Sequence, residues 1–387
     1  MKATAGIASD RLVLIVSEAP TPHNNYLFSA LARNSGLSME LNYVFSADRV
    51  PGRPWKSLRA DIPGMKAVRT GLGSWFDRRL FLQALRNRRT VFFVIGWNHP
   101  ILYLTILVVG IRRGYLLMWF DTPNPNRKQA AWQPKYWLNK LIVQMINRTS
   151  GTIFATGRQA RIGLQRLGLG EEKISILPFF VPFQDVELTN GRLAKLREKY
   201  QLVGDAVALL AAGRMIQSKG FDIFIDALAE LDRSRPEGWV AFLIGSGAES
   251  EALVRQAEAL GLMHRVRFLP WAEAEEFNEL MCVCDVFVAP ARFDPFPTTV
   301  ISAMNLGKPV VATKGVGSAM EFVVDGENGL IVESGRIDAL AEALARLLQF
   351  PELRMRIGNR AKRSMQRWPV ERGVQAIISA VDALSRS

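Results

Sequence analysis

The sequence predicts an α/β protein of two doubly wound, Rossmann-like domains that face each other across a cleft. Three observations support this class. Strand-like and helix-like runs alternate along the chain. The length of 387 residues exceeds what one core usually holds. Residues 178–191, with two prolines and three phenylalanines, interrupt the alternation. We therefore expect one domain at 1–185, joined by a returning C-terminal helix at 370–387, and a second domain at 191–369.

In the first half, short apolar runs alternate with stretches of helical pattern. The expected strands are 12–16, 41–45, 91–95, 115–120, 151–155 and 174–177. The expected helices are 25–34, 76–88, 101–109, 135–147 and 159–167. The apolar run 91–110 is interrupted by Gly96, Asn98, His99 and Pro100, so it predicts a strand and a helix rather than a membrane span.

The second half repeats the alternation. Its expected strands are 207–211, 239–244, 266–269, 286–289, 310–313 and 330–332. Its expected helices are 220–231, 250–260, 298–305, 337–348 and 370–384, the last packing back on the first domain. Sheets of this kind bind ligands at the carboxyl ends of their strands, so that edge is where we look for chemistry.

The positive charge is confined to one half. The chain carries +13, and residues 1–190 hold 25 Lys and Arg against 11 Asp and Glu. This asymmetry indicates an acidic partner such as nucleic acid, an anionic membrane or a polyanionic substrate, or else a basic surface that is merely solvated. Motifs of nucleic-acid modules are missing, so we expect no nucleic acid. Aromatic residues mixed with the charge at 74–81 and 132–140 favour an anionic membrane surface.

The sequence lacks the motifs of several kinds of catalytic and binding site. The sequence has no P-loop, no G-x-S-x-G elbow and only three histidines. Gly245-Ser246-Gly247 lacks the third glycine of a dinucleotide fingerprint. Cys282 and Cys284 have no second cluster to complete a metal site, and we interpret them as small buried hydrophobic residues. With two cysteines and no signal peptide, we expect a cytoplasmic protein that uses no metal and no cofactor.

The first chemistry-bearing segment follows the strand at 207–211. Gly213 at the strand end permits close backbone approach, and Arg214 and Lys219 follow on the loop, five residues apart. Two cations at this spacing suit a diphosphate, because each forms charge-assisted hydrogen bonds with it. An ordinary basic surface loop is the alternative.

The second segment, 290–313, runs from a strand through a carboxylate loop into a helix that opens at Pro297 or Thr298. Core packing explains its apolar residues but not Arg292 and Asp294 at the strand end. The free amides of Thr298 and Thr299 at the helix start favour a phosphate oxygen.

Residues 151–368 resemble retaining glycosyltransferases of the GT-B fold, in glycosyltransferase family 4. The resemblance rests on motifs in order, namely Gly213-Arg214, Lys219-Gly220, Gly245-Ser246-Gly247, Asp294-Pro295-Phe296, Ala303-Met304, 307–312, Glu321 and 325–330. It implies that Arg214 and Lys219 bind the diphosphate of a nucleoside-diphosphate sugar while the Asp294 loop holds the sugar. The implied donor-binding residues are Gly213, Arg214, Lys219, Gly245, Trp271, Asp294, Phe296, Pro297, Thr298, Thr299 and Ser302.

The resemblance also implies front-face attack with retention of the anomeric configuration, and a donor phosphate oxygen that takes the acceptor proton. Arg214, Lys219 and the helix amides then stabilise the departing diphosphate without a metal. The sequence departs from the family at Asp294 and Ser302, where two glutamates are usual, and at Pro297, where glycine is usual. Because the second glutamate grips the ribose hydroxyls in the family, its loss suggests a deoxyribose donor such as a dTDP-sugar.

In this fold the first domain binds the acceptor, which many relatives receive on a lipid carrier. A polyprenyl-diphosphate saccharide is acidic and membrane-bound, so we expect peripheral attachment to the inner leaflet of the cytoplasmic membrane through the basic half. His99 is a candidate catalytic residue, and His23, Asn24 and Asp121 are candidate acceptor-binding residues. Capping or loop roles remain open for His99 and Asp121. The alternatives to a glycosyltransferase in cell-surface polysaccharide synthesis are a GT-B epimerase or phosphorylase and a non-catalytic nucleotide-sugar-binding module.

Overall fold

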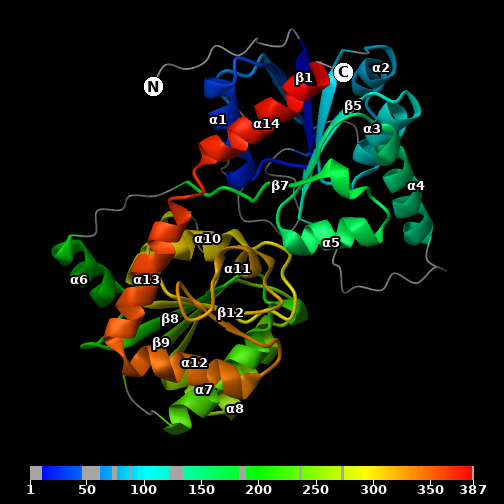
Figure 1. Cartoon of the computed structure of the whole chain (residues 1–387). Coiled ribbons are helices and arrows are strands. Elements are labelled where there is room, and N and C mark those ends of the chain that lie inside the picture. Colours follow the sequence, from blue (N-terminus) through cyan, green and yellow to red (C-terminus); the bar gives the residue numbers. More distant parts are fainter. Residues whose placement is uncertain are drawn as a thin grey trace. The chain divides into compact units, whose positions relative to one another are not determined.

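A computed structural model describes residues 11–45, 62–71, 76–87, 89–121, 134–182, 189–234, 238–271 and 274–385. The chain divides into two compact units, Met1–Val181 with Pro369–Ser387, and Pro182–Trp368. Each unit is built on one parallel β-sheet with helices packed against it, as Figure 1 shows. The predicted α/β class with two Rossmann-like sheets is confirmed.

Unit 1 holds a seven-stranded parallel sheet in the order β3-β2-β1-β4-β5-β6-β7. Its strands are β1 (Leu12–Ser17), β2 (Ser38–Tyr43), β3 (Ala67–Arg69), β4 (Val91–Ile95), β5 (Tyr115–Phe120), β6 (Ile153–Ala155) and β7 (Ile174–Ile176). Its helices are α1 (Pro22–Asn34), α2 (Arg78–Arg86), α3 (Pro100–Ile111), α4 (Pro134–Arg148), α5 (Arg158–Arg166) and α14 (Val370–Ser385), with a 3-10 turn η2 at Glu171–Lys173. The strands β4, β5 and β6 are apolar throughout because both faces of such a sheet are covered.

One face of this sheet packs on α2, α3, α4 and α5, whose inward residues share a core cluster with β1, β4, β5 and β6. Helix α3 has no polar face because it lies between this sheet and its neighbours α2 and α4. Gly110 lets α3 and α4 approach closely, since a Cβ there would lie 2.6 Å from the Cβ of Met145. A buried helix explains the apolar run at 101–109. None of the described helices is long and apolar enough to cross a membrane.

The C-terminal helix α14 packs on α1 within unit 1 (Figure 1). Val374, Ile377 and Val381 form its buried stripe. Gly373 faces the ring of Phe180, where a Cβ would come within 2.5 Å of a ring carbon. The helix therefore belongs to the unit that begins the chain.

Unit 2 holds a six-stranded parallel sheet in the order β10-β9-β8-β11-β12-β13. Its strands are β8 (Val207–Ala212), β9 (Trp239–Ile244), β10 (Val266–Leu269), β11 (Val286–Ala289), β12 (Val310–Thr313) and β13 (Leu330–Val332). Its helices are α6 (Asn190–Lys199), α7 (Phe221–Ser234), α8 (Ser250–Ala259), α9 (Ala274–Val283), α10 (Thr298–Asn305), α11 (Gly317–Phe322), α12 (Ile337–Gln349) and α13 (Pro351–Met365), with 3-10 turns η3 (Gln217–Lys219) and η4 (Leu262–His264). The strand order reverses between β8 and β11, which is where doubly wound sheets bind ligands.

The predicted elements need some corrections. Helix α1 begins at Pro22, because Thr21 caps it by accepting the N–H of Asn24, so 22–25 is helix rather than loop. Strand β3 and helices α6, α9, α11 and α13 were not expected. Parts of three predicted segments, residues 74–75, 132–133 and 183–188, lie outside the described residues.

Candidate functional site

A small pocket of about 20 Å³ opens at the point in unit 2 where the strand order reverses. It lies at the carboxyl ends of β8 and β11, and its wall includes the first turn of α10. Among the predicted site residues, its lining includes Lys219, Asp294, Pro297 and Thr299. The fold thus brings together two segments that are far apart in the sequence.

Lys219 and Asp294 form an ion pair in this pocket. Their side chains are only 19% and 12% exposed, so the pair is largely withdrawn from water. The main chain holds the carboxylate in place, since the Asp294 N–H donates to the Gly315 carbonyl at 2.9 Å and the Asp294 carbonyl accepts from Gly317 at 2.9 Å. A lysine ammonium has three donors, so pairing with one carboxylate leaves capacity for a second anion.

Glycines let the loops around this pocket come together. Gly245, with φ of 141°, stands where a Cβ would lie 1.9 Å from the carbonyl oxygen of Gly213. Gly220 ends η3 in the left-handed conformation, and a Cβ there would lie 2.2 Å from the carbonyl oxygen of Pro290. A side chain at Gly245 or Gly220 would push the β8 loop away from its neighbours.

Arg214 is exposed, and Met215 after it is buried. The Met215 N–H donates to the Ser246 carbonyl at 2.9 Å, which ties the β8 loop to the β9 loop. Arg214 is therefore attached to a backbone that is held in place, and its side chain is exposed to solvent.

Arg292 lies in the loop after β11, two residues before Asp294. It forms a bidentate ion pair with Asp222 at 2.6 and 2.5 Å and donates to the Gln217 carbonyl at 2.9 Å. Burial raises the pKa of Asp222, but the hydrogen bonds and charge of Arg292 outweigh it and leave that pKa below its ordinary value. Arg292 thus ties the Asp294 loop to η3 and α7.

Helix α10 begins at Thr298, with Pro297 as its N-cap residue. Pro297 offers no side-chain cap, and its carbonyl accepts the hydroxyl of Ser318 at 2.9 Å. The first amides of a helix have no partner within the helix, so Thr298 and Thr299 are placed to bind an anion.

Two predicted donor residues use their side chains in contacts within unit 2. Ser302 donates its hydroxyl to the Thr298 carbonyl at 3.2 Å, one turn back in the same helix. Phe296 is buried and packs edge-on against Phe322 with ring centroids 6.0 Å apart, so its side chain anchors the loop. Trp271 follows the end of β10 and is half-buried. Of these three residues, Phe296 has its side chain in the core.

In unit 1, His99 follows β4 and caps α3. Its Nδ1 accepts the N–H of Ile101 at 3.3 Å, and its ring meets the Phe45 ring edge-on at 5.2 Å. Burial lowers the pKa of His99, while the charge of Glu18 opposes the shift. His99 therefore has the capping role that the sequence left open, and its imidazole is neutral at pH 7.

The candidate acceptor residues lie close to the switch point of the unit 1 sheet, between β1 and β4. The His23 ring packs at a tilt against the Phe179 ring, with centroids 4.2 Å apart, and its Nε2 lies 3.1 Å from Thr21 Oγ1. Asn24 is buried in the first turn of α1, 3.5 Å from Ser17 Oγ. Asp121 directly follows β5. These residues lie near the carboxyl edge of the unit 1 sheet, but the Asn24 side chain is buried.

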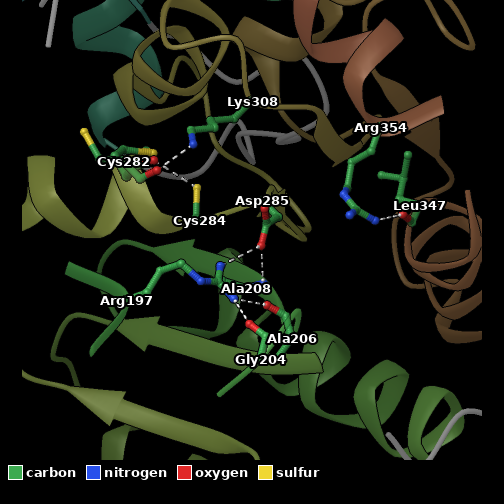
Figure 2. A network of polar contacts seen from close by, with 11 residues as sticks. Arg197, Gly204, Ala206, Ala208, Cys282, Cys284, Asp285, Lys308, Leu347 and Arg354 are labelled. Carbon is green, nitrogen blue, oxygen red and sulfur yellow. Dashed lines mark hydrogen bonds and ion pairs between the residues drawn. The ribbon is translucent and has the colours of Figure 1, made fainter. Parts of the chain in front are cut away.

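A second pocket, of about 540 Å³, lies at the opposite edge of the unit 2 sheet. Figure 2 shows the polar network around it, in which Asp285 accepts the Ala208 N–H at 2.8 Å and Arg197 donates to the Ala206 carbonyl at 3.0 Å. Lys308 donates to the Cys282 carbonyl, and Arg354 to the Leu347 carbonyl. These bonds join strands and helices, so the network is structural.

Both cysteines are buried and free, in agreement with their interpretation as small hydrophobic residues. Within the described ranges, no group of three His, Cys, Asp or Glu side chains could hold a metal ion.

The sheets, the switch-point pocket and its loops define a GT-B protein. Residues 194–364 match the family model of glycosyl transferases group 1. LpsE of Rhizobium meliloti (strain 1021), a lipopolysaccharide core biosynthesis glycosyltransferase, is 31% identical over 177 residues, 46% of this chain and 50% of that protein. The alpha-D-kanosaminyltransferase of Streptomyces kanamyceticus is 28% identical over 56% of this chain and 55% of its own. The chain thus spans about half the length of these curated relatives.

Solved structures agree on the fold of the whole chain. HepE of Anabaena, crystallised with UDP and glucose, aligns with a TM-score of 0.75 over 96% of this chain and 100% of its own, at 20% identity. WaaG, a glycosyltransferase involved in lipopolysaccharide biosynthesis, aligns with a TM-score of 0.69 at 16% identity. At these identities the likeness establishes the GT-B fold alone.

Proposed function

We propose that this protein is a retaining, metal-independent glycosyltransferase. It moves a hexose or deoxyhexose from a nucleoside-diphosphate sugar to a saccharide acceptor in cell-surface polysaccharide synthesis. The observation that carries the proposal is the Lys219–Asp294 ion pair beside the α10 N-terminus in the switch-point pocket. The match of residues 194–364 to glycosyl transferases group 1 and the named relatives support the same class of reaction.

In this proposal the leaving diphosphate is bound by three kinds of donor. Lys219 keeps one hydrogen bond to Asp294 and gives others to phosphate oxygens, Arg214 swings its exposed guanidinium onto the same group, and the amides of Thr298 and Thr299 complete the set. All three stabilise negative charge that grows as the glycosidic bond breaks. Asp294 orients Lys219 and accepts from a hydroxyl of the sugar.

Retention follows if the acceptor attacks from the face that the diphosphate leaves, with a phosphate oxygen accepting the proton. This mechanism needs no strong protein base, which suits a His99 whose imidazole is neutral and already caps α3. His99 then contributes a contact to the sugar or the acceptor hydroxyl rather than a proton transfer.

The donor nucleotide is proposed to carry deoxyribose. Ser302 is too short to reach a ribose, and its hydroxyl is bonded to the Thr298 carbonyl. A donor with fewer ribose hydroxyls leaves fewer polar groups unpaired at this position. Thermal shift with dTDP, UDP and GDP tests this point, because a shift with UDP or GDP but not dTDP contradicts it.

The acceptor is proposed to be a saccharide on a polyprenyl diphosphate, reached by a protein attached peripherally to the inner leaflet. The net positive charge of residues 1–190 supports an acidic acceptor and an anionic surface. His23 and Asp121, near the carboxyl edge of the unit 1 sheet, are the proposed acceptor contacts.

The deciding experiment is a thermal-shift screen of UDP, GDP, dTDP, ADP and CMP, repeated with Arg214→Ala. One nucleoside diphosphate should raise Tm, and Arg214→Ala should abolish the shift without lowering the Tm of the free protein, because Arg214 is exposed. The donor class found is then assayed for nucleoside-diphosphate release with acceptor saccharides.

Two outcomes of that assay would replace the proposal. Interconversion or phosphorolysis of the sugar without transfer to an acceptor would indicate a GT-B epimerase or phosphorylase. Nucleotide binding without turnover over a broad acceptor panel would indicate a binding module.

A further inference from the structure

The basic charge of unit 1 is concentrated in one continuous stretch. Residues 78–170 contain fifteen Lys and Arg and a single acidic residue, Asp121. This stretch includes α2, α3, α4 and α5, the helices that cover one face of the unit 1 sheet. Nine of these cations lie on α2, α4 and α5, and all nine are exposed or half-buried. We call them the basic layer, namely Arg78, Arg79, Arg86, Lys135, Lys140, Arg148, Arg158, Arg161 and Arg166.

Helix α4 carries apolar side chains on its outer side as well. Ile142, Val143 and Ile146 are buried against the sheet. On the other side Trp137, Leu138 and Leu141 are 63%, 39% and 41% exposed. Spacings of three and four residues place these three in one stripe. We call Trp137, Leu138 and Leu141 the α4 stripe.

Cations flank the α4 stripe. Lys135 in the first turn and Arg148 in the last are exposed, and Lys140 lies with its ammonium 5.8 Å from the centre of the Tyr136 ring. Helix α4 itself contains no acidic residue. A tryptophan, a tyrosine and leucines between lysines form the composition of a helix that lies in a bilayer interface.

Acidic residues near α2 and α5 offset only part of this positive charge. On the face of α2 and α5, Asp77 pairs with Arg69 and Glu171 pairs with Arg161. Glu40 lies 3.6 Å from Arg79. The outward charge of the layer therefore remains positive.

We propose that the α4 stripe and the basic layer form the docking surface for an anionic lipid bilayer. The stripe enters the headgroup region and the basic residues pair with anionic lipids. Nucleic acid would use the same cations, but it gives exposed leucines no apolar environment, whereas a bilayer does. The purpose of the docking rests on the proposed function, because it brings unit 1 to a lipid-linked acceptor.

The test uses sedimentation of the full chain with sucrose-loaded vesicles. One set is phosphatidylcholine with phosphatidylglycerol in a ratio of three to one, and the other is phosphatidylcholine alone. Binding to the anionic set should fall steeply with salt and be absent from the neutral set. The double variant Trp137→Ser and Leu141→Ser should weaken binding roughly tenfold or more, since it removes two inserted side chains. Lys135→Glu with Lys140→Glu should weaken it similarly.

Matched controls come from unit 2. Met355 is 66% exposed, a fraction similar to the 63% of Trp137. Lys195 is exposed on α6. Met355→Ser and Lys195→Glu should leave vesicle binding unchanged. Because all these positions are at the surface, circular dichroism and Tm should match the parent chain. Trp137→Phe adds a second readout, since a blue shift of tryptophan emission on vesicle binding should shrink in this variant.

Three results would overturn the proposal. The first is binding to anionic vesicles that is unaffected by the α4 stripe variant. The second is equal binding to neutral vesicles. The third is tighter binding to poly(U) than to vesicles at the same salt, which would assign the basic layer to nucleic acid. Transfer to a water-soluble acceptor reports the proposed function separately, and the α4 stripe variant should retain it.

Discussion

The ion pair of Lys219 and Asp294 gives the sharpest prediction. Lys219→Met removes the cation and leaves the Asp294 carboxylate without its partner at 12% side-chain exposure. Breaking a fully buried pair costs about 3–5 kcal/mol, and the partial exposure of both side chains reduces this to about 2–3 kcal/mol. For a domain of this size, each kcal/mol lowers Tm by about 2–4 °C, so Tm should fall by about 4–12 °C.

The companion variants separate stability from binding. Lys219→Met with Asp294→Asn removes both charges and should recover most of the lost stability, because no unpaired charge remains. The double variant should still fail to bind the nucleoside diphosphate, since the diphosphate needs the ammonium. The assay is thermal unfolding of the four proteins with and without nucleotide, read as a double-mutant cycle. A Lys219→Met protein with the parent Tm, or a coupling energy near zero, would refute the reasoning.

Three further predictions concern the loops around the site and a buried thiol near the opposite edge of the same sheet. Arg292→Ala should cost about 1 kcal/mol by freeing Asp222, because the pair is half exposed. The pKa of Asp222 is lowered in the folded protein, so its contribution is present above pH 3.8 and is lost as the pH falls below that value. Acid unfolding of Arg292→Ala should therefore lose this part of its slope. Gly245→Ala should cost several kcal/mol and prevent nucleotide binding, because its Cβ would overlap the Gly213 carbonyl oxygen, as urea unfolding would reveal. Burial raises the pKa of Cys284 to about 12, so Ellman's reagent at pH 8 should label it only after denaturation, and rapid labelling of the native chain would contradict this.

The strands were predictable because a buried parallel strand is a short, continuous apolar run that can be identified from neighbouring residues alone. Residues 91–95, 239–244 and 310–313 are mostly apolar and rich in β-branched or aromatic residues, and their predicted limits match the structure. Helices α9 and α13 were missed for the opposite reason. Their outer faces are strongly charged, and this charge hides the apolar spacing that packing reveals.

The candidate site was predictable by position and less so by orientation. The motifs placed Asp294 and Ser302 on one loop and helix, but only the structure distinguishes a carboxylate in the pocket from a hydroxyl bonded within its own helix. His99 illustrates the same limit, since a histidine two residues before the Ile101 N–H can always act as a cap. The same histidine at the start of a helix can cap the helix or contact a ligand, so the sequence alone does not distinguish the two roles.

Arg292 was the residue that local analysis could not assign. Its partner Asp222 lies 70 residues earlier in the chain, and Lys219 and Asp294 are 75 residues apart. Such pairs form because the strand order places β8 beside β11, so the loops that follow them share one edge. The two ion pairs tie the same two loops, one facing solvent and one facing the pocket. If the outer pair holds the loops while the inner pair binds the donor, Arg292→Lys should retain nucleotide binding and Lys219→Arg should alter it, although both changes conserve charge.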